Sequence, residues 1–86
     1  MELFLNLVQE FNAALERAVD AHGQRRGSKV ITDEIHYADD IYETIAEEIR
    51  LQGLHEPIAG VPPLADMYSR LKTTEALVLP NPDDRR

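Results

Sequence analysis

The chain has 86 residues, of which 43% are apolar and 29% are charged, so it is long enough for one small domain and too short for two hydrophobic cores. It contains no cysteine, so neither a disulfide nor a thiolate metal site can stabilise it, and we expect self-association or a partner protein to do so. Its net charge of −7 disfavours direct binding to nucleic acid or to an anionic membrane surface.

The start of the sequence differs from an export signal, because Glu2 precedes the first apolar residues and the first basic residue is Arg17. Polar residues also interrupt every apolar run well before the roughly 18 residues that a membrane-spanning helix needs. We therefore expect a cytoplasmic protein that does not enter the membrane.

Residues 3–22 carry apolar side chains at helical spacing and predict an amphipathic helix, with Gly23 as the expected C-cap. In the first two turns the apolar residues surround most of the helix, which exceeds what one small chain is expected to cover. We predict that these residues form the interface of a homo-oligomer: Leu3, Phe4, Leu5, Leu7 and Val8.

Residues 24–29 form a short basic segment that predicts a turn, after which Val30 and Ile31 are expected to be extended. Thr32 is a suitable N-cap, and the acidic residues that follow it suit the first turn of a helix. A second helix is therefore expected over residues 33–52, ended by Gly53. Its apolar stripe alternates by three and four residues: Ile35, Ala38, Tyr42, Ile45 and Ile49.

Prolines and a glycine in residues 54–63 predict an irregular connection, followed by a shorter third helix over residues 63–77. Residues 80–86 contain two prolines and little apolar surface, and are expected to be a disordered tail. The predicted fold is thus an all-α, three-helix domain over residues 1–79, whose first two helices form an antiparallel hairpin.

The second helix is strongly acidic, with seven acids and no lysine or arginine between Asp33 and Ile49. A helix without cations beside its acids lacks the usual stabilising pairs, which favours docking on a basic protein surface. The expected contact residues are Asp39, Asp40, Glu43, Glu47 and Tyr37. On this interpretation the chain is a non-enzymatic regulator or inhibitor, of the class that includes antitoxins and phage antagonists. A solvated helix face that only keeps the protein in solution is the alternative.

Two further interpretations concern small ligands. Arg25, Arg26 and Lys29, flanked by small residues, have the composition of an anion-binding turn, and a nucleotide-like ligand is one candidate; an ordinary interhelical turn is the other. His36 shares its helical spacing with three carboxylates, as in helical metal proteins, although the first helix offers few facing ligands.

Catalysis has little support in the sequence. The three histidines are far apart in the chain, there is no cysteine, and neither Ser28 nor Ser69 lies in a nucleophile motif. We therefore predict no catalytic residues, no metal and no cofactor.

Overall fold

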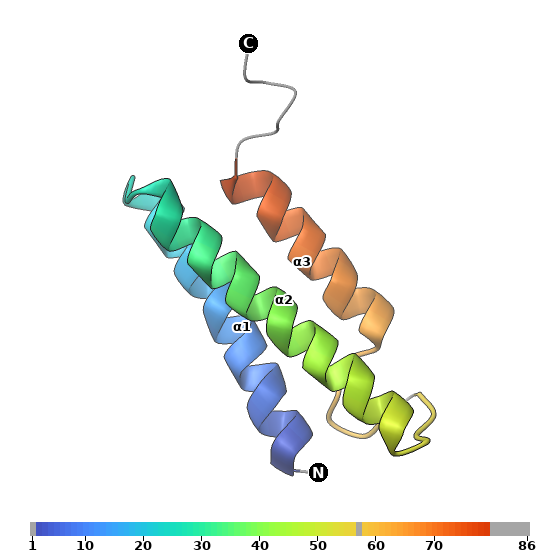
Figure 1. Ribbon diagram of the computed structural model, residues 1–86. Coiled ribbons are helices and arrows are strands. Elements are labelled where there is room, and N and C mark those ends of the chain that lie inside the picture. Colours follow the sequence, from blue (N-terminus) through green and yellow to red (C-terminus); the bar gives the residue numbers. More distant parts are fainter. Residues whose placement is uncertain (1, 57, 80–86) are drawn as a thin grey trace.

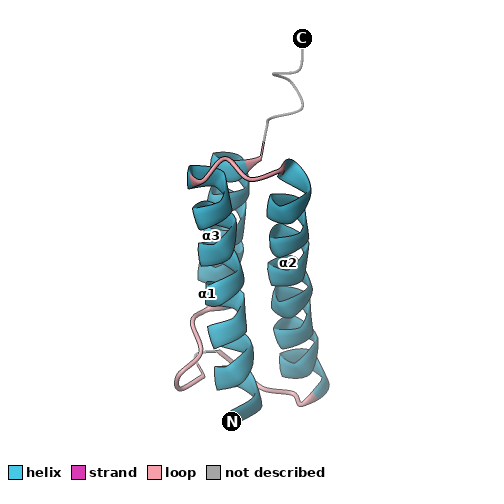
Figure 2. Cartoon of the chain, turned by 90° about the vertical axis from the view of Figure 1, so that its left-hand side faces the viewer, coloured by secondary structure: helices cyan, strands magenta, loops and turns pink. Residues whose placement is uncertain are grey.

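The computed structural model describes residues 2–56 and 58–79, and this part of the chain contains three α-helices. They are α1 (Glu2–Gly23), α2 (Ser28–Leu51) and α3 (Leu64–Val78). Figures 1 and 2 show that α2 runs opposite to both α1 and α3. The expected all-α architecture with an antiparallel hairpin is confirmed, whereas the expected disordered tail lies outside the described residues.

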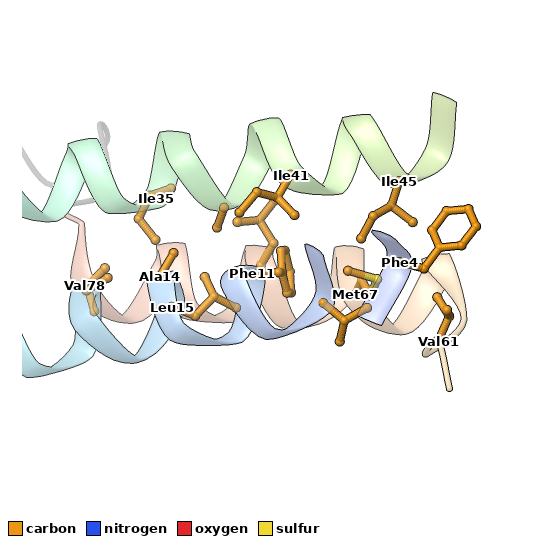
Figure 3. Packing of buried hydrophobic residues seen from close by; sticks show 14 of the residues in the cluster. Phe4, Phe11, Ala14, Leu15, Ile35, Ile41, Ile45, Val61, Met67 and Val78 are labelled. Carbon is orange, nitrogen blue, oxygen red and sulfur yellow. The ribbon is translucent and has the colours of Figure 1, made fainter. Parts of the chain in front are cut away.

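The core lies where the apolar stripes of the three helices meet (Figure 3). From α2 it receives six residues at helical spacing: Ile31, Ile35, Ala38, Ile41, Ile45 and Ile49. The largest fully buried side chains are Phe4, Phe11, Ile35, Ile45 and Leu71. Among the described residues no polar or charged side chain is buried, so the hydrophobic effect is the main force that holds the helices together.

Helix α2 begins at Ser28, five residues earlier than predicted, with Gly27 as its N-cap. The prediction that Thr32 caps the helix is wrong, and Val30 and Ile31 are helical, not extended. Two contacts favour the longer helix. Ile31 adds a buried side chain to the apolar stripe, and Lys29 forms an i,i+4 ion pair with Asp33 at 3.2 Å.

Helices α1 and α2 end in the same way, with a residue in the left-handed region two positions beyond the last helical residue. At the end of α2 this residue is Gly53, with φ 64°, and the amide of the next residue, Leu54, donates to the carbonyl of Ile49. At the end of α1 it is Arg25, with φ 59°, and Arg26 donates to Ala21. Both are Schellman motifs. Gly23, the expected C-cap, is still helical.

The connection between α2 and α3 is held by a carboxylate and a tight turn. The carboxylate of Glu56 accepts a hydrogen bond of 2.6 Å from the backbone amide of Leu64 and so caps the first turn of α3. Ile58 and Val61 pair across a turn in which Gly60 has φ 81°. The positive φ favours glycine at this position, and the turn packs against the Leu5 side chain of α1, whose methyl group would lie 2.9 Å from a Cβ at Gly60.

Candidate functional site

Four residues of α2 form an exposed line that we call the acidic ridge: His36, Asp40, Glu43 and Glu47. They follow one another by four, three and four residues, which places them on one face of the helix. The sequence predicted this common face beside the apolar seam. In the structure the buried isoleucines occupy the other side of α2, so the ridge points away from the core.

Tyr37 and Asp39, which we expected to belong to the same contact surface, lie on either side of the ridge. The Tyr37 side chain is 43% exposed, but its hydroxyl donates a hydrogen bond of 2.9 Å to Glu10 of α1. This bond raises the pKa of Tyr37, because the protonated phenol is the form that donates. Tyr37 therefore joins two helices, and only part of its surface is available to a partner.

Asp39 is half-buried on the side of α2 that faces α3. Its charge adds to that of Glu75 in raising the pKa of Lys72, and Glu75 has the larger effect because it forms an ion pair with that lysine. Lys72 lies 5.4 Å from the ring centre of Tyr68, which in turn contacts Tyr42 at a ring separation of 5.7 Å. Tyr42 was expected in the core and is instead half-buried at its edge.

The acidic segment has more cationic partners than its sequence indicated. Lys29 pairs with Asp33, Arg17 of α1 pairs with Glu34, and Arg50 pairs with Glu47. These cations lie outside the acidic stretch in the sequence, and helical spacing or the antiparallel hairpin brings them to it. In the described part of the chain, the acidic residues of α2 without an ion pair within 4 Å are Asp39, Asp40, Glu43 and Glu48.

Residues 24–27 of the basic segment are exposed and lie directly before the start of α2. The first turn of α2 carries no acidic residue and Gly27 provides no side-chain cap, so the first amide groups of this helix have no side-chain acceptor from the cap residue. Lys29, the third residue of the predicted anion site, is helical and its ammonium group is paired with Asp33. The anion-binding interpretation stays a prediction and rests on the two arginines.

The predicted oligomer interface separates into buried and exposed residues. Phe4 and Val8 are buried in the chain's own core, which removes them from any external contact surface. The sequence had suggested that the chain cannot cover this end of the first helix, but the turn at Ile58 and Val61 covers part of it. Leu7 is half-buried, and Leu3 and Leu5 remain 52% and 41% exposed.

Neither a cluster of metal-ligating side chains nor a membrane-spanning helix is found among the described residues. No group of three or more His, Cys, Asp or Glu residues within residues 2–56 and 58–79 is placed to hold a metal ion, and His36 is exposed on the ridge. Across the same residues, no helix combines the length and the apolar character that a membrane span requires.

A groove between α1 and α3 was not predicted from the sequence. The part toward the C-terminus of α1, which we call the upper part, is lined by Leu15, Val19, Thr74 and three polar residues: Asn12, Glu16 and Asp20. A smaller hollow of about 220 Å³ continues it toward the N-terminus of α1, between Phe11 and Met67. Arg70 lines both parts and donates a hydrogen bond across the groove to Asn12. We call this surface the α1–α3 groove.

Comparison of the chain with protein-family models, with curated proteins and with solved structures finds no match.

Proposed function

We propose that this chain is a non-enzymatic binding protein that docks the acidic ridge of α2 on a basic surface of a larger protein. The observation that carries the proposal is the position of Asp40 and Glu43 at the middle of an exposed line of side chains opposite the core. Neither carboxylate has an ion pair within the described residues, and each repels the other at a spacing of three residues. A partner's cations would relieve this repulsion.

The spacing of the two carboxylates indicates which basic residues the partner surface needs. Asp40 and Glu43 are about 5–6 Å apart at their β-carbons, so one arginine or two adjacent lysines are able to contact both carboxylates. Both ends of α2 already carry paired cations, Lys29 with Asp33 and Arg50 with Glu47. The attraction is therefore concentrated at the centre of the helix, and the partner's basic residues are expected to meet it there. The absence of buried polar side chains among the described residues supports a binding role more than a catalytic one.

The test compares two double variants with the same change in charge. Asp40→Lys/Glu43→Lys alters the acidic ridge, and Glu16→Lys/Asp20→Lys alters exposed acids of α1. Each tagged chain is incubated with extract of its source cells, and the retained proteins are identified by mass spectrometry across a salt gradient. We expect a partner that the natural chain and the α1 variant retain, that salt releases, and that the ridge variant loses.

Circular dichroism of each variant shows whether the helices are intact, so that loss of a partner is separated from loss of fold. The proposal would be contradicted if every salt-sensitive partner that the α1 variant retains were also retained by the ridge variant with the same salt dependence. The anion-binding alternative makes a different prediction, because it places the contact at Arg25 and Arg26 and is insensitive to both double variants.

A further inference from the structure

The α1–α3 groove is a second candidate surface, lined by residues of α1 and α3 and by none of the acidic ridge. Its floor is made by buried core residues, Phe11 and Leu15 of α1 and Met67 of α3. In the part toward the C-terminus of α1, Val19 lines the groove and is 39% exposed. Apolar surface is thus open to solvent along a recess whose walls are two helices.

The groove has the length of a short helix, and the larger of its two parts, at about 490 Å³, also has the volume of a small-molecule pocket. The stretch of α1 from Val8 to Asp20 that lines it is about 18 Å long at a rise of 1.5 Å per residue, which matches roughly three turns of a second helix. The lower hollow, at about 220 Å³, is smaller than the roughly 300–1,000 Å³ typical of small-molecule pockets, so it suits one inserted side chain.

The charges at the rim indicate which helix fits. Glu16 and Asp20 line the groove on α1, and Asp66 lines it on α3. None of the three has an ion pair within the described residues. Arg70, the basic residue of the lining, is hydrogen-bonded to Asn12. A second copy of this chain carries a net charge of −7 and meets repulsion at this rim.

We propose that the α1–α3 groove binds a basic amphipathic helix of another protein. The apolar residues of that helix contact Leu15 and Val19, one of them enters the hollow beside Met67, and its lysines or arginines pair with Glu16 and Asp20. This is the helix-in-groove mode of recognition, with anchors at i, i+3, i+4 and i+7. The proposal does not depend on the acidic ridge, which is on a different helix and has no apolar recess among its residues.

The probe is a synthetic four-turn peptide of leucine and lysine, with leucines at i, i+3, i+4 and i+7, titrated into the full 86-residue chain. Backbone NMR shifts locate the bound peptide, and calorimetry measures its affinity. We expect saturable binding with the largest shifts at Asn12, Leu15, Val19 and Thr74. Glu16→Lys/Asp20→Lys and Val19→Asp should each weaken binding at least tenfold, while the matched ridge variant Asp40→Lys/Glu43→Lys should change it less than threefold.

Two control peptides separate a shaped site from general attraction between opposite charges. A peptide of the same composition with leucine and lysine in alternation has no apolar helical face and should bind at least tenfold more weakly, as should a leucine–glutamate version of the helix. Equal affinity for the alternating peptide, an equal loss in the ridge variant, or no saturable binding would overturn the proposal. So would concentration-dependent dimerisation of the chain alone that shifts the same groove resonances, because a second copy would then be the occupant.

Discussion

Helix α1 meets its two neighbours in different ways, closely on the side of α2 and loosely on the side of α3. Helix α1 packs on α2 much more extensively than on α3. The sequence of α1 explains the close side. Ala14 and Ala21 alternate at helical spacing with Glu10 and Arg17, whose side chains contact α2, so small residues face that helix. Small side chains let two helix backbones approach.

On the side of α3, larger and more polar residues of α1 line the groove, among them Asn12, Leu15, Glu16 and Val19. Among the residues that the structure describes, one side-chain hydrogen bond crosses the groove, from Arg70 to Asn12, while two cross between α1 and α2. Helix α1 is therefore closely packed on the side that faces α2 and more open on the side that faces α3. The groove therefore lies where α3 packs against residues of α1 that are larger than the alanines facing α2.

The largest expected effect comes from adding volume on the two sides. Ala14 has no exposed surface, so Ala14→Leu should overfill the close side and lower the free energy of unfolding by about 1–3 kcal/mol. Thr74 lines the groove, so Thr74→Leu should change the free energy of unfolding by no more than about 0.5 kcal/mol. Urea unfolding followed by helical circular dichroism measures both. Equal losses in the two variants would show that the groove is as tightly packed as the hairpin.

A smaller effect on stability is expected from removing the cap at the N-terminus of α3. Glu56→Ala removes the carboxylate that caps the Leu64 amide and should cost about 1 kcal/mol, within the range found for helix caps. Amide hydrogen exchange should then accelerate in α3 and remain unchanged in α1 and α2, since the close side does not use this contact. His55→Ala, at the neighbouring exposed position, is the control and should leave exchange unaltered. Uniform acceleration in all three helices would mean that α3 does not open separately.

The sequence predicts the helices well because their apolar stripes are local patterns. The isoleucine stripe of α2 is readable at every turn, and the acidic ridge follows from the same periodicity. The start of α2 was missed because Thr32 with its following acids forms a cap signal. That signal is outweighed by the burial of Ile31 and the pairing of Lys29 with Asp33. A cap contributes about 1 kcal/mol, and a buried isoleucine contributes more.

What the sequence could not predict depends on contacts between segments that are distant in the chain. The α1–α3 groove lies between two helices that are not consecutive in the chain, so no local sequence pattern encodes it. The bonds of Glu10 to Tyr37 and of Glu34 to Arg17 likewise require the register of the hairpin. Because of these two bonds, Tyr37 and Glu34 of the expected docking helix already contact α1 and are less available to a partner.

The smallest expected effect concerns the hydrogen bond that joins Tyr37 to Glu10 on the close side. This bond raises the pKa of Tyr37 in the folded state above the value of about 10 in the unfolded state, so it stabilises the fold below pH 10. The contribution is lost as pH rises through the higher folded pKa. We expect the melting temperature of the natural chain to exceed that of Tyr37→Phe at pH 7 to 9, and the difference to shrink above pH 10. Lys72, whose pKa is also raised, titrates in both proteins and cancels in the difference. A difference that stays constant up to pH 11 would show that the phenol does not make this bond in solution.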